Sequence, residues 1–546
     1  MKKILWVCIS TILMISVFYA CSDTGRSKKE LSDGEIIASS QDAIVVTESG
    51  KVAGYIEDGI YIYKGIPYAK AERFTPPVAP DSWDAIRSSR AYGPTCPQGK
   101  RMGWYSDDQA FAFNWDDGYP DENCLRANIW TQGINDGKKR PVMVWLHGGG
   151  FSAGSGQELP SYDGKNLAKK GDVVVVTLNH RLNILGFLDL SAFGNKYKQS
   201  GNVGMLDLVA ALQWVQKNIS NFGGDINNVT IFGQSGGGGK VTALMSMPIA
   251  KGLFHKAIVQ SGSLLHCMEP TYSREIGLAV AAELGLTPAR IDELKSVPYE
   301  QLLEAGQKAV RKVRQKAVEN GVTPSLLFGW APVFDGITLP FRPSSQQAFE
   351  ISKNVPVLIG STLHEFLKSS YNPALKQMSL EEAKKEIEKQ YGNKTDALIA
   401  AFSATYPGFK PIDLFDVDLM FRPMAIKQAT LKAALNGAPA YMYLFTWESP
   451  VPDGALRSMH CMELPFVFNN IYNSRTMTGG TEAAYALADK MSSCWINFAR
   501  TGNPNADGLP EWKSYNPEEG ATMIFNNICE VKYNHDSELL KIANSE

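Results

Sequence analysis

The chain has 546 residues, of which 44% are apolar, so it is long enough to bury a large core. Its 54 basic and 56 acidic residues nearly balance, and no long basic run occurs. This charge pattern argues against nucleic acid or an anionic membrane surface as the ligand, and we expect a neutral or small molecule instead.

The first 20 residues have the pattern of a secretion signal. Two lysines precede a mostly apolar run that ends at Ala20, and Cys21 and a polar segment follow. A small residue followed by cysteine resembles the end of a bacterial lipoprotein signal, in which the cysteine becomes the lipidated first residue. An ordinary cleaved signal peptide and an uncleaved anchor are the alternatives.

A lipid on Cys21 would be the protein's only association with a membrane. We therefore expect an exported lipoprotein in the periplasm or on the outer membrane of a Gram-negative bacterium. Residues 21–41 are polar and charged, which is typical of a flexible tether. No repeat or low-complexity segment follows, so we predict a single domain over residues 42–546.

Six further cysteines lie beyond the signal. Cys96 and Cys124 bracket a loop rich in glycine, aspartate and aromatic residues, and export makes a disulfide between them plausible. No pairing is evident for the other four, which are Cys267, Cys461, Cys494 and Cys529. The chain has no C-x-x-C pattern and no H-E-x-x-H among its seven histidines, so we expect no metal site.

In chain order, the first predicted elements are short. Residues 43–46 and 59–63 predict antiparallel strands at the edge of a sheet. Residues 141–146 and 172–177 predict strands covered on both faces, because 141–146 and 173–176 are continuously apolar, and residues 202–219 have helical spacing. This alternation of strand and helix indicates an α/β fold with a doubly wound, mostly parallel sheet.

The second half of the chain continues the pattern. Residues 257–260, 355–359 and 440–445 predict further strands of the sheet. The segments from about 270 to 320 and from 379 to 405 are largely helical by period. The second of these begins with the spacing of a capping box.

The residues around Ser235 predict a nucleophile at a strand-to-helix turn. Residues 229–232 are a short strand-like run and residues 240–245 favour a helix. Residues 233–237 read Gly-Gln-Ser-Gly-Gly and fit the G-x-S-x-G elbow, a tight turn that lifts the serine hydroxyl clear of the backbone. The loop His147-Gly-Gly-Gly150 follows a predicted strand, where acyl-transfer enzymes place N–H donors for an oxyanion.

Two other glycine-rich loops fail on spacing. A Walker loop needs a glycine five residues before Gly239 and a serine or threonine after Lys240, but those positions hold Gln234 and Val241. A dinucleotide-binding loop is excluded because residues 148–154 have the wrong interval. The elbow interpretation therefore remains.

Together these motifs resemble the type-B carboxylesterases, the family of α/β-hydrolases that includes cholinesterase-like and para-nitrobenzyl-esterase-like enzymes. The resemblance covers the chain from about Ala43 to its C-terminus. It rests on residues 65–69, 122–125, 147–151, 179–182, 201–207, 222–225, 233–237, 260–263, 332–336 and 498–504. It implies an α/β-hydrolase fold with a large, mostly parallel central sheet, flanking helices, and helical insertions around an active-site gorge.

The resemblance implies a Ser-His-Glu triad. Ser235 would be the nucleophile, Glu365 the acid and His460 the base, and the order Ser, Glu, His is that of α/β-hydrolases. Asp335 is the alternative acid, although its position is more typical of a turn. The oxyanion donors implied by the family are the N–H groups of three glycines, namely Gly149, Gly150 and Gly236.

The family also implies structural contacts. Cys96 and Cys124 match its bridged loop, and two pairs match its structural ion pairs, namely Arg73 with Glu122 and Arg181 with Asp207. Six aromatic residues in the loop between the cysteines are expected either to line the gorge or to pack the loop. They are Trp104, Tyr105, Phe111, Phe113, Trp115 and Tyr119.

The chain departs from the family pattern beside the nucleophile. Gln234 stands where cholinesterases have a glutamate, Gly236 replaces the usual alanine, and Phe366 replaces the glycine that usually follows the acid. The first two changes predict a neutral and slightly roomier elbow. A cationic substrate is therefore not expected.

We predict a secreted serine hydrolase that cleaves carboxylic esters through an acyl-enzyme on Ser235, without a cofactor. Its partner would be a small-molecule ester. Two alternatives remain: a catalytically silent binding protein with the same fold, and a triad hydrolase that prefers thioesters, amides or lactones.

Overall fold

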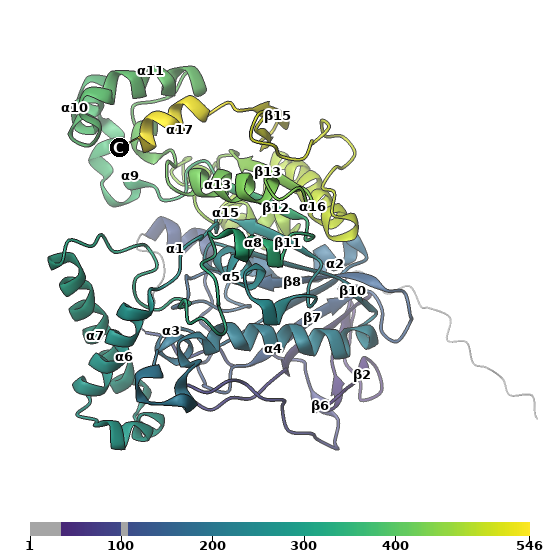
Figure 1. Ribbon diagram of the computed structural model, residues 1–546. Helices are drawn as coiled ribbons and strands as arrows, with labels where there is room; N and C mark the ends of the chain where they lie inside the picture. The colour runs from purple at the N-terminus through teal and green to yellow at the C-terminus, as the bar shows by residue number, and fades with distance from the viewer. Residues whose placement is uncertain (1–33, 100–106, 546) are drawn as a thin grey trace, which may run out of the picture.

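The computed structural model describes residues 34–99 and 107–545 of the chain. A twelve-stranded sheet runs through the molecule in the order β1-β4-β5-β7-β9-β8-β10-β11-β12-β13-β14-β15 (Figure 1). The strands from β9 to β14 pair in parallel, and both flanks of the sheet are antiparallel. The predicted mostly parallel α/β sheet is confirmed.

Strands of both sheets have the following bounds. The central sheet contains β1 (Ile36–Ile37), β4 (Tyr55–Glu57), β5 (Ile60–Pro67), β7 (Arg126–Thr131), β8 (Arg140–Leu146), β9 (Val174–Leu178), β10 (Gly224–Gln234), β11 (Lys256–Gln260), β12 (Val357–Thr362), β13 (Ala440–Phe445), β14 (Ala521–Phe525) and β15 (Glu530–Tyr533). A three-stranded sheet contains β2 (Ile44–Thr47), β3 (Gly50–Ala53) and β6 (Arg87–Ser88). The strand expected at residues 43–46 therefore forms, but in this small sheet and not at the edge of the large one.

The helices lie on both faces of the central sheet and in insertions. They are α1 (Asp107–Phe113), α2 (Lys165–Gly171), α3 (Asn183–Phe187), α4 (Val203–Asn218), α5 (Gly236–Met245), α6 (Pro270–Glu283), α7 (Tyr299–Glu319), α8 (Gln346–Ile351), α9 (Lys368–Tyr371), α10 (Leu380–Tyr391), α11 (Thr395–Thr405), α12 (Asp413–Asp416), α13 (Phe421–Ala433), α14 (Leu464–Val467), α15 (Arg475–Thr478), α16 (Glu482–Thr501) and α17 (Ser537–Asn544). None of the helices in the described ranges is long and apolar enough to span a membrane.

Continuous apolar strands are explained by cores on both faces of the sheet. In β8, Val142 and Val144 pack into one hydrophobic cluster, while Met143 and Trp145 pack into another. Helices α4, α5 and α13 contribute to the first cluster, and α2, α14 and α16 to the second. Successive side chains of a strand point to opposite faces of the sheet. A strand that is covered on both faces is therefore apolar at every position and does not alternate apolar and polar residues.

The helical insertions form two groups on the same side of the sheet. Figure 1 shows α6 with α7 at the lower left, and α9, α10 and α11 beside the C-terminal α17 at the upper left. The region predicted as one helical segment over residues 379–405 is two helices, α10 and α11, separated at Gly392. The predicted capping box is confirmed, because Ser379 and Glu382 cap each other's backbone N–H groups.

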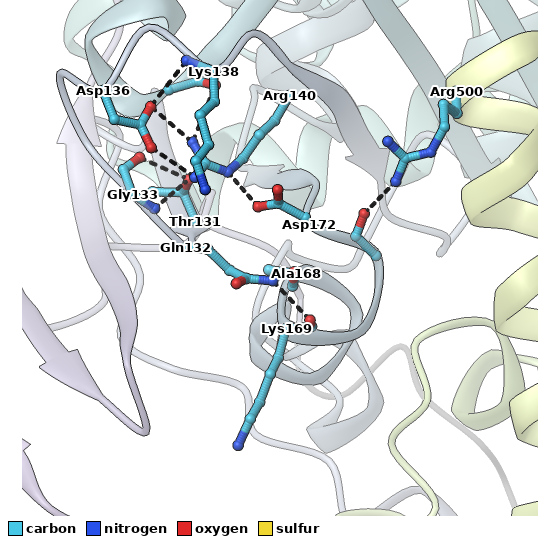
Figure 2. Close-up of polar contacts among 12 residues, drawn as sticks. Thr131, Gln132, Gly133, Asp136, Lys138, Arg140, Ala168, Lys169, Asp172 and Arg500 are labelled. Carbon is cyan, nitrogen blue, oxygen red and sulfur yellow. Dashed lines mark hydrogen bonds and ion pairs between the residues drawn. The ribbon is translucent and has the colours of Figure 1, made fainter. Parts of the chain in front are cut away.

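A polar network fixes the N-terminal end of β8 (Figure 2). Arg140 is 3% exposed, donates two hydrogen bonds to Asp136 at 2.7 and 3.0 Å, and pairs with Asp172 just after α2. Gln132 donates to the Lys169 carbonyl at 2.8 Å. A buried arginine is stable only when its donors are paired, so these contacts tie β8 to α2.

Candidate active site

Ser235 lies at the turn between β10 and α5, with φ 58° and ψ −125°. A positive φ is strained for a residue with a Cβ, and such strain is typical of functional turns. The Ser235 N–H donates to the Gln260 carbonyl at 2.8 Å, which ties the turn to β11. A Cβ on Gly237 would lie 1.9 Å from the Leu146 carbonyl oxygen, so only glycine fits there. The predicted elbow geometry is confirmed.

His460 lies in the segment between β13 and α14, and Glu365 follows β12. The His460 Nδ1 atom is hydrogen bonded to Glu365 Oε2. The His460 N–H also donates to the Glu365 carbonyl at 2.8 Å, and the Thr362 N–H donates to Glu365 Oε1 at 3.0 Å. Both residues are 2% exposed. The imidazole is therefore oriented by a carboxylate that is itself fixed.

A second contact holds the two loops together. His364 Nδ1 is 2.7 Å from Ser458 Oγ, and the His364 N–H donates to the Ser458 carbonyl at 3.3 Å. These residues each lie one or two positions from Glu365 and His460. His364 thus joins the segment that carries Glu365 to the segment that carries His460.

Ser235 and His460 face the same cavity, which has a volume of about 430 Å³. Glu365 lies behind the imidazole and is not part of the cavity wall. Asp335, the alternative acid, accepts hydrogen bonds from the N–H groups of residues 337–339 and from Asn202. Asp335 is therefore a turn residue, as its sequence context indicated.

The glycine loop after β8 forms part of the cavity wall. Gly149 and Gly150 have φ values of 77° and 61°, in the region that favours glycine. A Cβ on Gly149 would lie 2.3 Å from the Ala153 carbonyl oxygen. A Cβ on Gly236 would lie 2.1 Å from the Gly150 carbonyl oxygen. The three glycines predicted to supply oxyanion donors are therefore neighbours, and the space expected beside Gly236 is filled by the Gly150 backbone.

Gln234 contacts the imidazole directly. Its Nε2 atom is 3.2 Å from His460 Nε2, and its Oε1 atom accepts a hydrogen bond from the Cys461 thiol at 3.1 Å. The ring also packs against two aromatic residues: the Phe366 ring centroid is 4.6 Å and the Phe421 centroid 5.6 Å from that of His460. The contact by Phe421 was missed in the sequence, since nothing local links it to residue 460.

Aromatic side chains shape the rest of the cavity. Of the six aromatic residues in the predicted gorge loop, Trp115 lines the cavity and Phe113 is buried in the core. Phe111 and Tyr119 are exposed. The other two, Trp104 and Tyr105, lie outside the described residues. Both expected roles, lining and packing, therefore occur in this loop.

Three buried carboxyl groups near the site have raised pKa values, so they are less ionised at neutral pH than exposed carboxyl groups. Burial raises the pKa of Glu158, which lines the cavity, to about 8. Burial, and then the negative charge of Glu365, raise the pKa values of Asp418 and Glu463 to about 7. Glu365 is the carboxylate that binds His460. No group of three or more His, Cys, Asp or Glu side chains that could hold a metal ion occurs in the described ranges.

The predicted disulfide is absent. Cys96 and Cys124 are free, buried thiols. They are nevertheless in contact, because a hydrogen bond with Cys96, together with burial, raises the pKa of Cys124 well above its usual value. The Leu182 N–H also donates to Cys96 Sγ at 3.3 Å. The two ends of the loop meet as predicted, but hydrogen bonds and packing hold them without a covalent bond.

Both predicted ion pairs are confirmed. Arg181 donates to Asp207 at 2.6 and 2.8 Å, and both side chains are buried. Arg73 pairs with Glu122. The first pair joins the segment after β9 to α4, and the second joins the segment after β5 to the segment before β7.

A serine on a strand-to-helix turn of a mostly parallel sheet, beside a histidine that is bonded to an acid, defines the α/β-hydrolase class. Residues 41–540 match the model of the carboxylesterase family. The chain is 37% identical to the para-nitrobenzyl esterase of Bacillus subtilis over 502 residues, which cover 91% of this chain and 97% of that protein.

Solved structures agree with this assignment. An esterase from Clostridium hathewayi that can hydrolyze aliphatic aromatic polyesters is 35% identical, with a TM-score of 0.78 and coverage of 93% of this chain and 99% of that one. A carboxylesterase of Geobacillus stearothermophilus is also 35% identical, with a TM-score of 0.73 and coverage of 92% and 100%. The chain belongs to the carboxylesterase family and is a carboxylic ester hydrolase.

The close contact between Gly236 and the Gly150 backbone can be tested by substitution. In Gly236→Ala the new Cβ must displace the Gly150 backbone, so we expect kcat to fall at least about tenfold, because small misplacements near reacting atoms are costly. The atoms that must move are buried main chain, so the melting temperature should fall as well, despite the higher helix propensity of alanine. Steady-state kinetics and thermal unfolding check both expectations, and a variant with wild-type kcat would contradict the role of this contact.

Proposed function

We propose that the chain hydrolyses neutral carboxylic esters through an acyl-enzyme on Ser235, with His460 as general base and acid and Glu365 as its orienting carboxylate. One observation carries the proposal: Ser235 on its strained turn faces the same cavity as an imidazole whose Nδ1 is bonded to Glu365. Nδ1 is bonded to the carboxylate, so Nε2 is the ring nitrogen that exchanges a proton with the serine.

In the first half of the reaction, Ser235 Oγ attacks the ester carbonyl carbon while His460 Nε2 takes the hydroxyl proton. The carbonyl oxygen becomes an oxyanion, to which the N–H groups of Gly149, Gly150 and Gly236 donate. Collapse breaks the bond to the alcohol oxygen, and His460 returns the proton to the departing alcohol. Glu365 stabilises the imidazolium throughout.

In the second half, a water molecule attacks the acyl carbon of Ser235. His460 takes a proton from the water and returns it to Ser235 Oγ as the second tetrahedral intermediate collapses. The carboxylic acid leaves and the free serine is restored. No redox step or co-reactant other than water is needed.

The cavity favours an uncharged substrate with an aromatic or bulky apolar group. Its apolar lining includes Trp115, Leu159, Tyr162 and Phe366. Gln234 places an uncharged amide at the position where cholinesterases have a glutamate. Related enzymes are a para-nitrobenzyl esterase and an esterase that can hydrolyze aliphatic aromatic polyesters. We infer that esters of this kind bind here, in preference to choline-type esters.

We also propose that residues 42–546 act as one catalytic domain that is exported and anchored by a lipid on Cys21. The support is the sequence pattern of two lysines, an apolar run, and a small residue before Cys21. Residues 1–33 lie outside the described residues.

The triad is tested by active-site labelling. A serine-directed fluorophosphonate should label the wild type but not Ser235→Ala, and kcat should fall about 10⁴- to 10⁶-fold in that variant. Glu365→Gln should lower kcat about 10⁴-fold because the imidazole loses its orienting charge. Asp335→Asn is the matched control and should keep wild-type kcat. An unlabelled wild type would favour the silent binding protein.

Charge selectivity is tested at residue 234. Gln234→Glu places a buried negative charge on the cavity wall, so it should favour a cationic substrate. We expect the ratio of kcat/KM for butyrylcholine to that for its uncharged analogue 3,3-dimethylbutyl butyrate to rise about tenfold. The paired substrates cancel any general loss of activity. An unchanged ratio would show that residue 234 does not set charge preference.

The anchor is tested by metabolic labelling with an alkyne fatty acid in a Gram-negative host. Label should be incorporated into the wild type and into Cys8→Ala, whose cysteine lies within the signal, but not into Cys21→Ala. Globomycin should block processing of the wild type. Label that persists in Cys21→Ala would exclude this site of lipidation.

A further inference from the structure

We propose that Lys240 is a positioning residue for the oxyanion hole: it holds and polarises the glycine loop, residues 147–150, through hydrogen bonds to main-chain carbonyls. The inference rests on the proposed function, because it assigns a role to a residue that contacts the loop and not the substrate. Lys240 lies on α5, five residues after Ser235, and is fully buried. Its position links the helix that follows the nucleophile to the loop that follows β8.

The hydrogen bonds of Lys240 go to the main chain of that loop. Its Nζ atom donates to the His147 carbonyl at 2.8 Å and to the Gly148 carbonyl at 3.3 Å. Nζ also lies 5.8 Å from the centroid of the Phe151 ring, at the far end of the loop. In the described part of the chain, Lys240 forms no hydrogen bond or ion pair with a carboxylate. A buried ammonium is costly unless its donors are used, so the loop carbonyls are its main partners.

The Gly148 carbonyl receives two donors. His147 Nδ1 lies 3.0 Å from the same oxygen, and since a carbonyl only accepts, Nδ1 carries the proton. Burial, followed by the charge of Lys240, lowers the pKa of His147 well below its usual value, so the imidazole is neutral. Burial lowers the pKa of Lys240 to about 7, so the cationic donor at this carbonyl is the protonated form of Lys240.

The geometry of a peptide unit connects this contact to the cavity. The C=O of Gly148 and the N–H of Gly149 belong to one planar peptide and point in opposite directions. A cation at the oxygen draws electron density from the nitrogen, which makes the N–H a stronger donor, because hydrogen bonds in a chain polarise one another. The N–H of Gly149 is one of the proposed oxyanion donors, so Lys240 acts on the transition state through Gly149.

A Gly149 N–H that is held in place and polarised by Lys240 stabilises the transition state more than it stabilises the bound ester. The developing oxyanion is negatively charged, whereas the ground-state carbonyl is neutral, so a stronger N–H donor gains more in the transition state. Lys240 should therefore affect kcat and leave KM nearly unchanged. A lysine that only filled space in the core would affect stability instead.

The test compares Lys240→Met with Lys432→Met. Lys432, on α13, is also buried and also donates to two consecutive main-chain carbonyls, those of Ser352 at 2.9 Å and of Lys353. It does not line the catalytic cavity. Both substitutions remove a buried ammonium with little change in volume, so Lys432→Met reports the general cost of that loss.

Four quantities are measured for each variant: melting temperature, kcat and KM for a para-nitrophenyl ester, and Ki for a trifluoromethyl ketone. The ketone forms a tetrahedral adduct with the nucleophile and places an oxyanion in the hole. For Lys240→Met we expect kcat to fall about 10- to 100-fold, KM to stay within about twofold, and Ki to rise by the same factor as kcat falls. Lys240→Gln, which keeps an uncharged donor, should be intermediate. Lys432→Met should change only the melting temperature.

The proposal is overturned if folded Lys240→Met keeps wild-type kcat and Ki, or if Lys432→Met lowers kcat equally. A rise in KM with unchanged Ki would also overturn it, as would failure of both Lys240 variants to fold, which would assign the residue to stability. These results are distinct from a failure of the proposed function. Fluorophosphonate labelling of the wild type and its loss in Ser235→Ala do not depend on Lys240.

Discussion

The close approach of two backbone segments is the constraint on which the site depends. Strands β8 and β10 are parallel neighbours, with Leu146 paired to Gly233, so the glycine loop and the nucleophile turn leave the sheet side by side. Side chains at Gly236 or Gly237 would collide with this loop or with the end of β8. Glycine is costly in a helix, and the start of α5 carries four in succession: the first three face neighbouring backbone, and the fourth, Gly239, faces the Leu264 side chain.

The distribution of charge at the site follows from burial. Glu158, Asp418 and Glu463 have raised pKa values because water is excluded, so the cluster avoids several negative charges at close range. Glu365 bonds both to the imidazole and to the Thr362 N–H. Glu158 and Asp418 also accept main-chain N–H groups, so the bond to His460 is the contact that distinguishes Glu365 from these buried carboxylates.

Much of the precision of the site comes from segments that do not touch the substrate. The segments of Glu365 and His460 are joined through His364 and Ser458, and the glycine loop is supported by Lys240 from α5. At the other end of β8, Arg140 ties the strand to α2 (Figure 2). A strand fixed at its start carries its C-terminal loop to a defined place, which is how a rigid sheet positions loops that hold reactive groups.

The sequence alone determined the elements whose shape depends on neighbouring residues. The elbow at Ser235, the glycine loop, the buried strands and the capping box at Ser379 all follow from local periodicity and from where glycine is required. The roles of Glu365 and His460 came from resemblance, because no local pattern connects them to residue 235.

Tertiary structure decided everything that depends on which distant segments meet. The strand expected at residues 43–46 lies in the small sheet, and Cys96 and Cys124 are in contact as thiols. The space expected beside Gly236 is occupied by the Gly150 backbone. The tertiary structure also brought Lys240 into contact with the glycine loop. In the sequence, the residues around Lys240 had served only to exclude a Walker loop. Strand order and register set such contacts, and these depend on the packing of the whole sheet rather than on the residues next to each position.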